Sequence, residues 1–198
     1  MTGSSASTLT VLQRELLAAL AARSPSFFLT GGAVLAGWVL GHGRTDDLDL
    51  FTEDDEAMAD ADRVVRGAAA EIGAVAEAVR SRLVRERVPA LYPNVVRDGI
   101  RMDTVEEIVA NKLCALVRRV EVRDLVDIWH LDRAGYRVER FLADAARKDG
   151  GVTPATVAYV LASFPLPPDL PAGADLAELL AFMRDLEQRM RRLALPGT

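Results

Sequence analysis

The spacing of hydrophobic residues predicts alternating helices and strands over the first quarter of the chain. Apolar residues recur at helical spacing over residues 9–22, and the short apolar run 27–30 predicts a buried strand that ends at a glycine pair. A helix is predicted over residues 33–40, and residues 48–51 predict a second strand. This order of elements is typical of a small sheet with helices packed on it.

Beyond this region the pattern becomes mainly helical. Residues 53–70 predict one helix, residues 73–79 a possible strand, and residues 95–102 a tight hairpin or an edge strand, because Asp98-Gly99 interrupts them. Asp103-Thr104 followed by two glutamates predicts the start of a helix that extends to about residue 119. Further helices are predicted over residues 124–133, 137–148, 154–163 and 175–193.

This succession of elements predicts the fold class and its division. We expect an α+β fold, in which residues 1–103 form a small mixed sheet with flanking helices. Residues 104–198 are expected to form a helical part, with a proline-rich linker at residues 165–171 before the last helix.

Composition narrows the classes of function. The net charge of −5 argues against nonspecific duplex binding, because such binding depends on many phosphate contacts. The single cysteine excludes a disulfide framework and any cysteine-rich metal site. The longest apolar run is interrupted by Thr30, Gly31 and Gly32, and a spanning helix needs roughly 20 apolar residues. We therefore expect a cytoplasmic protein without a membrane segment.

The first candidate for chemistry joins a glycine pair to two aspartates through one short helix. Gly31-Gly32 at a strand-to-helix turn lets backbone N–H groups approach a phosphate, and the alternative is a simple tight turn. Asp47 and Asp49 alternate with leucines on a strand, so both carboxylates share one face and suit a divalent cation. The alternative for this pair is a solvated loop edge. Together the two features are more specific than either alone.

The second candidate is a basic and acidic cluster in the helical part. Lys112 shares a helix face with Ile108 and Leu116, so its ammonium either snorkels to the surface or contacts a phosphate. Only Lys112 and Lys148 are lysines among the 24 basic residues. Such rare use of lysine indicates that arginine does not fulfil the same role at these positions. Asp124 and Asp127 lie three residues apart near basic residues, and a structural ion-pair cluster is the alternative.

These features, in this order, resemble the AbiEii/AbiGii toxin family of nucleotidyltransferases, a branch of the polymerase-β-like superfamily. The resemblance spans roughly residues 27–148. The matching motifs are Phe28-Leu29-Thr30-Gly31-Gly32, Leu40-Gly41-His42, Asp46-Asp47-Leu48-Asp49-Leu50-Phe51, Glu107-Ile108 with Asn111-Lys112-Leu113 and Ala115-Leu116, and Arg123-Asp124-Leu125 with Asp127.

The resemblance implies a nucleotidyltransferase-type sheet and a set of site residues. Asp47 and Asp49 would hold Mg²⁺, and the catalytic set would add Lys112 and Asp127. The residues implied in nucleotide binding are Thr30, Gly31, Gly32, Lys112, Arg118, Arg123 and Asp124. The implied reaction is in-line attack of a hydroxyl on the α-phosphate of a nucleoside triphosphate, with pyrophosphate leaving. The implied partners are the triphosphate, a tRNA acceptor and an antitoxin protein.

One departure from the family pattern bears on activity. The family shows a third metal-binding aspartate on a later strand, and here Arg82 stands where that aspartate belongs. Asp98 and Asp103 are possible substitutes, although Asp103 also suits a helix cap. The sequence thus leaves three interpretations open: an active transferase, a relative that binds nucleotide or a partner without turnover, and an unrelated interaction module.

Overall fold

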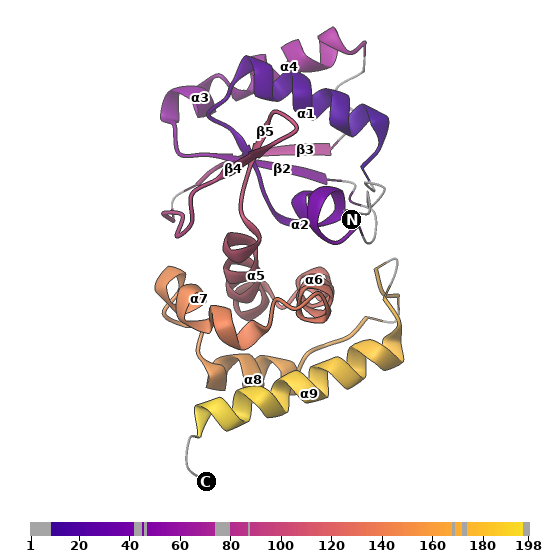
Figure 1. The fold of residues 1–198 in the computed structure, drawn as a ribbon, viewed down its shortest axis with the longest axis vertical. Coiled ribbons are helices and arrows are strands. Elements are labelled where there is room, and N and C mark those ends of the chain that lie inside the picture. Colours follow the sequence, from indigo (N-terminus) through magenta and orange to yellow (C-terminus); the bar gives the residue numbers. More distant parts are fainter. Residues whose placement is uncertain are drawn as a thin grey trace, which may run out of the picture. The chain divides into compact units, whose positions relative to one another are not determined.

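The computed structural model of the protein describes residues 9–41, 45, 47–73, 80–86, 88–167, 169–171 and 174–195. The chain forms two compact units, Met1–Val105 and Glu106–Thr198. The elements of the first unit are α1 (Val11–Arg23), β1 (Phe28–Leu29), α2 (Gly31–Val34), the π-helical turn η1 (Leu35–Val39), β2 (Asp47–Thr52), α3 (Asp55–Ala59), α4 (Ala61–Glu71), β3 (Arg80–Arg85), β4 (Val95–Arg97) and β5 (Ile100–Met102) (Figure 1).

The strands form a five-stranded mixed sheet with the order β3-β2-β1-β5-β4. β1 is antiparallel to β2 and parallel to β5, whereas β3 is parallel to β2 and β4 is antiparallel to β5. The carboxyl ends of β1 and β5 therefore lie at the same sheet edge as the amino ends of β2, β3 and β4. This edge is called the Thr30 edge below, because Thr30 directly follows β1.

The two faces of the sheet differ in chemistry because side chains alternate along a strand. Leu48, Leu50 and Thr52 of β2 are buried on one face, whereas Asp47, Asp49 and Phe51 are half-buried on the other. Figure 1 shows α1 and α4 on one side of the sheet and α2 on the other. Alternation along β2 therefore fixes the two aspartates on the face opposite the buried leucines.

Side-chain hydrogen bonds of Thr10 and Gln13 fix where the first helix begins and connect it to the segment that precedes β2. The Thr10 hydroxyl accepts a hydrogen bond from the Gln13 backbone N–H at 3.1 Å, and the Thr10 N–H donates to Gln13 Oε1 at 2.9 Å. This reciprocal pair is a capping box and satisfies backbone donors of the first turn. Gln13 Nε2 also donates to the Thr45 carbonyl at 2.8 Å, so α1 holds the segment that leads into β2.

The α+β class is confirmed, and two predicted elements of the first unit need correction. The helix predicted over residues 53–70 is two helices, α3 and α4, separated at Asp60. The strand predicted over residues 73–79 is wrong at its start, because Gly73 has a positive φ of 66° and ends a helical turn. Residues 74–79 lie outside the described residues, and the strand observed in this region is β3. The predicted hairpin is confirmed as β4 and β5, with Asp98 and Gly99 in the turn at φ 51° and 77°.

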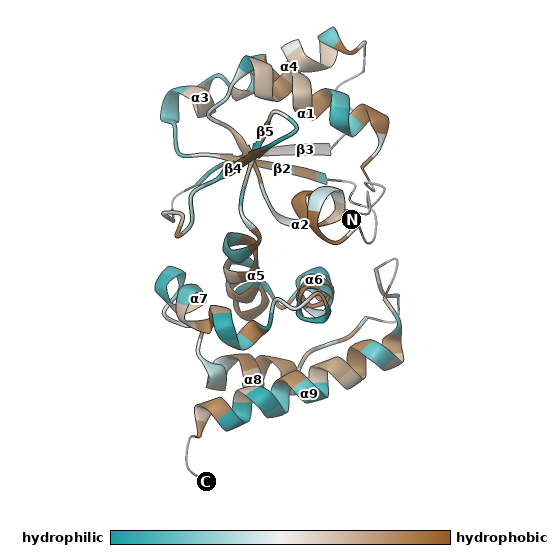
Figure 2. Cartoon of the chain, viewed as in Figure 1, coloured by the Kyte–Doolittle hydropathy of each residue, from teal (hydrophilic) through white to brown (hydrophobic). Residues whose placement is uncertain are grey.

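The described residues of the second unit form helices joined by loops, with no strand among them. Its elements are α5 (Val105–Arg119), α6 (Val122–Arg133), the 3₁₀ turn η3 (Val138–Phe141), α7 (Leu142–Lys148), α8 (Pro154–Ala162) and α9 (Leu176–Ala194). Figure 2 shows hydrophobic and hydrophilic residues alternating along α9, as expected for a helix with one buried face. No helix in the described part of the chain is long and apolar enough to span a membrane.

Candidate functional site

The Thr30 edge brings the two sequence motifs of the first unit together. Thr30 N–H donates to the Asp49 carbonyl at 3.1 Å, which extends the β1–β2 pairing by one bond. Gly31 then begins α2 with a positive φ of 65°, a conformation that side chains other than that of glycine rarely adopt. The glycine turn and the aspartate strand are therefore direct neighbours in the sheet.

The Asp49 carboxylate lies against the glycine turn itself. A Cβ built at Gly31 would be 3.9 Å from Asp49 Oδ2, so this carboxylate faces the start of α2. A Cβ built at Gly32 would meet the Thr45 hydroxyl at the same distance. Oxygen atoms of this kind are the ligands that Mg²⁺ prefers, and a small turn beside them leaves room for phosphate oxygens.

Asp47 and Asp49 are the two carboxylates on the half-buried face of β2, as the alternation predicted. Among the described residues, no group of three or more histidine, cysteine, aspartate or glutamate side chains is arranged to hold a metal ion. His42 and Asp46 of the family motif lie outside the described residues. At this edge, the structure therefore describes two parts of the predicted site, namely the two aspartates of β2 and the glycine turn.

Asp103 is a buried carboxylate at the same edge, and it contacts the glycine turn through Thr30. The residue is 4% exposed, and its N–H donates to the Leu29 carbonyl at 3.0 Å. Asp103 Oδ2 accepts a hydrogen bond from the Thr30 hydroxyl at 2.5 Å, and Oδ1 accepts one from Asn94 Nδ2 at 2.8 Å. Asp103 therefore sits across β1 from Asp49 and fixes the residue that precedes the glycines.

The other candidate substitute for the third carboxylate, Asp98, lies at the opposite edge of the sheet. It occupies the β4–β5 turn, and its Oδ2 accepts a hydrogen bond from Trp38 Nε1 at 2.7 Å. The three residues of β5 separate this turn from Asp103, which corresponds to roughly 10 Å at about 3.3 Å per residue. Of the two, Asp103 is the carboxylate that the sheet places near Asp49.

Arg82 pairs with Asp49 in the register of the parallel β2–β3 ladder. The position opposite Asp49 on β3 is therefore occupied by a basic residue rather than a carboxylate.

In the second unit, Lys112, Asp124 and Asp127 form one ion-pair cluster. Lys112 Nζ lies 2.9 Å from Asp124 Oδ1 and 2.6 Å from Asp127 Oδ2, and the lysine side chain is 14% exposed. Burial alone lowers the pKa of Lys112, but the charges of Asp127 and Asp124 outweigh burial, so its pKa is raised. Arg119 adds a second cation to Asp124, with Nη2 3.0 Å from Oδ2.

The remaining predicted residues of this unit are at its surface. Arg118 is 69% exposed and pairs with Asp149, whose pKa is lowered by this contact, and Arg123 is exposed near the start of α6. Sequence reasoning missed a second buried lysine pair, Lys148 with Glu107, whose side chains are 5% and 2% exposed. The scarcity of lysine was the available signal, because both lysines of the chain form buried ion pairs.

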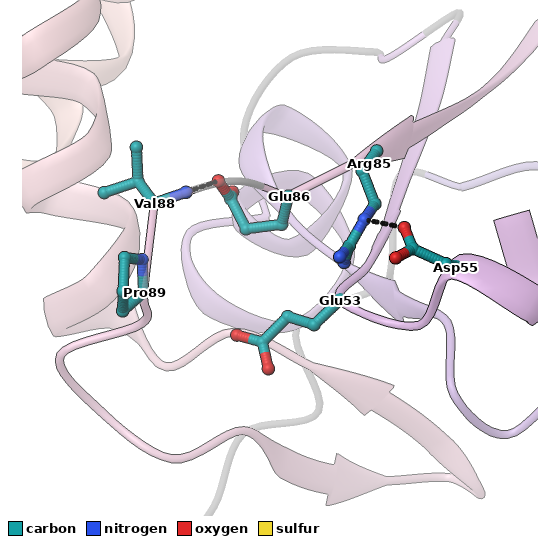
Figure 3. Close-up of a pocket in the computed structure, with 6 residues that line it drawn as sticks. All are labelled: Glu53, Asp55, Arg85, Glu86, Val88 and Pro89. Atoms are coloured by element: carbon teal, nitrogen blue, oxygen red, sulfur yellow. Dashed lines mark hydrogen bonds and ion pairs between the residues drawn. The ribbon is translucent and has the colours of Figure 1, made fainter.

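A cavity of about 520 Å³ opens at the opposite edge of the sheet, where β2 and β3 end (Figure 3). Arg85 Nε pairs with Asp55 Oδ1 at 2.6 Å, and the Glu53 carboxylate points away from this pair. Glu53 and Glu86 give the lining an excess of negative charge. Its position and charge both argue against a triphosphate in this cavity.

Residues 77–194 match the sequence profile of the family described as nucleotidyl transferase AbiEii toxin, type IV TA system. The match covers more than half of the chain, and it begins after Asp47 and Asp49. Among curated proteins, no sequence matches this chain significantly.

Two solved structures share the fold over most of the chain. JHP933 from Helicobacter pylori has a TM-score of 0.53 and 20% sequence identity, and the similarity covers 92% of each chain. A Helicobacter pylori protein described as a candidate nucleotidyltransferase has a TM-score of 0.51 and 18% identity, over 92% of this chain and 94% of the other. These similarities concern the fold.

Proposed function

This chain belongs to the AbiEii family of nucleotidyltransferase toxins from type IV toxin–antitoxin systems, and from that premise we propose that it binds a magnesium–nucleoside triphosphate and transfers the nucleotide to an RNA hydroxyl, with tRNA as the acceptor. The observation that carries the proposal is the Asp49 carboxylate facing the Gly31 turn, with Asp47 on the same strand face. This arrangement offers oxygen ligands for a cation beside a turn that phosphate oxygens can approach.

In this proposal, different residues of the Thr30 edge bind the metal ion and the triphosphate. Asp47 and Asp49 would hold magnesium, which when bound would neutralise phosphate charge and polarise the α-phosphate. The backbone of Thr30, Gly31 and Gly32 would receive the triphosphate, because glycine allows the chain to approach it closely. In the reaction, the acceptor hydroxyl gives up its proton to solvent, its oxygen bonds to the α-phosphorus, and the bond to pyrophosphate breaks.

The roles of the second unit's residues stay predictions. Lys112 and Asp127 are predicted to be catalytic, and Arg118, Arg123 and Asp124 to contribute to nucleotide binding. These predictions are supported by the charged side chains that lie around Lys112 in the helical unit. The ion pairs of Lys112 also give this cluster a structural function, because they hold together α5 and α6.

A second candidate function is nucleotide binding with little or no transfer. The observation that favours it is the register of Arg82 opposite Asp49, where the family has a carboxylate. Two aspartates can hold one magnesium ion with help from phosphate oxygens and water, but they are less suited to a second ion that activates the hydroxyl. We therefore expect slow transfer from a protein that binds its nucleotide normally.

Transfer of label from α-labelled triphosphates to a total tRNA pool tests the proposal. We expect weak incorporation by the wild type, lost in Asp47→Ala and retained in Asp62→Ala, since Asp62 is an exposed carboxylate on α4. Absence of magnesium–triphosphate binding in the wild type would contradict both candidates. Robust transfer that depends on Asp47 would contradict the impaired form.

Membership of a type IV toxin–antitoxin family leads us to propose an antitoxin partner as well. Expression of the chain alone should slow bacterial growth, and co-expression of the product of a neighbouring gene should restore it. Growth that is slowed equally with and without the neighbouring product would count against that partner.

A further inference from the structure

Asp49, Thr30 and Asp103 lie side by side across β2, β1 and β5 at the Thr30 edge. The antiparallel pairing of β1 with β2 sets Leu29 opposite Leu50, so the next pair along the ladder is Thr30 with Asp49. The Thr30 N–H accordingly donates to the Asp49 carbonyl at 3.1 Å. On the other side of β1, the Asp103 N–H donates to the Leu29 carbonyl at 3.0 Å. Thr30 is therefore the middle member of this row.

Ring contacts indicate which face of the sheet the row occupies. Phe28 and Phe51 pair in register, and their ring centroids are 6.2 Å apart, so both side chains are on one face. Arg101 of β5 lies over the Phe28 ring at 5.4 Å. Each member of the row is two positions from one of these residues, and alternation returns its side chain to the same face. Opposite Cβ atoms of an antiparallel pair are about 4.5–5.5 Å apart, so the Thr30 side chain lies beside that of Asp49.

The Thr30 hydroxyl gives its proton to Asp103. Asp103 Oδ2 accepts this hydrogen bond at 2.5 Å, while Oδ1 accepts one from Asn94 Nδ2 at 2.8 Å, which holds the carboxylate in place. Thr30 and Asp103 are both buried. A threonine hydroxyl has one proton to donate and two lone pairs that accept. Because Asp103 takes the proton, the hydroxyl oxygen has only lone pairs to offer to any other group.

We propose that Asp103 is a positioning residue, which makes the Thr30 hydroxyl an uncharged oxygen ligand for the metal ion held by Asp47 and Asp49. The inference rests on the proposed function and adds a third protein oxygen to its metal site. Mg²⁺ takes oxygen ligands, and a threonine hydroxyl is one of them in other phosphate-binding sites. Both oxygens of Asp103 accept hydrogen bonds, and Thr30 separates it from Asp49, so Asp103 acts through the hydroxyl.

Variants of Thr30 test the ligand with Mn²⁺ as the probe, because Mn²⁺ shares the preference of Mg²⁺ for oxygen ligands. Mn²⁺ is titrated without nucleotide, and the loss of the paramagnetic resonance signal of the free ion measures its binding. Thr30→Val keeps the shape of the side chain but removes the hydroxyl, and we expect it to weaken Mn²⁺ binding about tenfold. Thr30→Ser keeps the hydroxyl and should keep most of the affinity.

The matched control is Thr52→Val, which removes a buried hydroxyl from the opposite edge of the same sheet. The Thr52 hydroxyl accepts a hydrogen bond from the Asp54 N–H at 3.1 Å, so its loss should affect the stability of the fold. We expect Mn²⁺ binding to stay at the wild-type level in this variant. An equal loss of Mn²⁺ affinity in Thr52→Val and Thr30→Val would overturn the inference.

Variants of Asp103 separate positioning from direct metal binding. The amide oxygen of Asp103→Asn still accepts the Thr30 proton once Asn94 turns its own amide, so this variant should keep most of the Mn²⁺ affinity. Asp103→Leu accepts no proton, and we expect it to weaken Mn²⁺ binding about tenfold, as for other residues that orient a metal ligand. In a Thr30→Val background, Asp103→Leu should have no further effect, because it acts through the missing hydroxyl. Circular dichroism establishes which variants are folded, and Asp103→Asn and the Thr30 variants decide the question even if Asp103→Leu does not fold.

The inference is overturned if Thr30→Val binds Mn²⁺ like the wild type. It is also overturned if Asp103→Asn loses as much affinity as Asp49→Ala, since Asp103 would then be a ligand itself, or if the effect of Asp103→Leu persists in full in the Thr30→Val background. In each of these cases, loss of binding in Asp49→Ala leaves the proposed function standing. If the wild type binds Mn²⁺ only together with a nucleoside triphosphate, the same variants are compared by calorimetric titration with that complex. If it binds neither, the proposed function itself fails.

Discussion

Asp49 is the residue at which the aspartate strand and the glycine turn meet. Its carbonyl accepts from Thr30 and its carboxylate faces Gly31. Replacing either aspartate by alanine removes one carboxylate ligand of the magnesium ion. Each 1.4 kcal/mol of binding free energy that is lost lowers the affinity about tenfold. We expect Asp47→Ala and Asp49→Ala each to weaken magnesium-dependent triphosphate binding about a hundredfold. Calorimetric titration with magnesium and each triphosphate measures this change.

The control for these variants is Asp62→Ala, whose side chain is 79% exposed on α4. All three variants should unfold at nearly the wild-type temperature, because neither β2 aspartate is fully buried. Wild-type affinity in both β2 variants would show that these aspartates do not form the metal site.

Lys112 combines a structural contact with a predicted binding role. Removing it leaves Asp124 buried without its closest cation, and breaking a buried pair in this way costs about 3–5 kcal/mol. We expect Lys112→Ala to lower the free energy of unfolding and to weaken triphosphate binding. Lys112→Arg should restore binding only in part, because a planar fork replaces a compact charge. Urea unfolding and titration at low temperature separate the two effects; a folded alanine variant that binds like the wild type would leave Lys112 with the structural role alone.

At the scale of elements, the pair of Lys148 and Glu107 joins α7 to α5. Both side chains are almost fully buried, so Lys148→Met should lower the free energy of unfolding by about 3–5 kcal/mol. The double variant Lys148→Met with Glu107→Gln should recover much of this loss, because no uncompensated charge remains buried. Urea unfolding of the three proteins measures the difference.

The matched control is the pair of Arg118 and Asp149, in which the arginine side chain is 69% exposed and the aspartate side chain 14% exposed. Ion pairs with an exposed arginine contribute about 0–1 kcal/mol, so Arg118→Ala should lower the free energy of unfolding by about 1 kcal/mol or less. An equal loss in Arg118→Ala and Lys148→Met would contradict the distinction between a buried and an exposed cation in this unit.

An ion-pair network around Arg189 joins α9 to α6 and η3, and we expect it to make the stability of this unit depend on pH. Arg189 Nη1 lies 2.7 Å from Glu139 Oε1 and 3.2 Å from Asp132 Oδ1. Burial raises the pKa of Glu139, but a backbone hydrogen bond and Arg189 outweigh it, so its pKa is lowered. A carboxyl whose pKa is lower in the folded state stabilises the fold at pH values above its unfolded pKa of about 4.3. This stabilisation is lost as the pH falls through the folded pKa.

We therefore expect Glu139→Gln to be less stable than the wild type at pH 7 by about 1 kcal/mol, and the two proteins to converge at acid pH. Urea unfolding at pH 7, 5 and 3.5 measures the difference. Glu178→Gln removes an exposed partner of Arg133 and should have little effect at any of these values. A difference that grows as pH falls would contradict the sign of this linkage.

At the scale of the whole molecule, local patterns predicted the elements well but not their pairings. Period-2 alternation in β2 placed Asp47 and Asp49 on one face, and the Asp98-Gly99 turn predicted the hairpin. The contacts of Asp103 with Thr30 and Asn94 depend on strand order, which no local pattern encodes. The start of β3 was missed because its residues are mainly arginines, which carry no strand signal.

The strand order also leads to a test of whether the residue at position 82 limits the rate of nucleotide transfer. Arg82 pairs in register with Asp49. As a general scale, two like unit charges 4 Å apart repel each other by about 4 kcal/mol at an effective dielectric constant of 20. A cation at this position opposes a second metal ion, whereas a carboxylate would help to bind it. We expect Arg82→Asp to increase the rate of nucleotide transfer at least about tenfold, and Arg82→Asn, which only removes the charge, to increase it less. Single-turnover transfer of α-labelled nucleotide to tRNA, at saturating triphosphate, measures the three rates. If Arg82→Asp transfers no faster than the wild type while binding the triphosphate equally well, the register position of Arg82 does not limit the reaction, and Asp103 becomes the carboxylate to replace next.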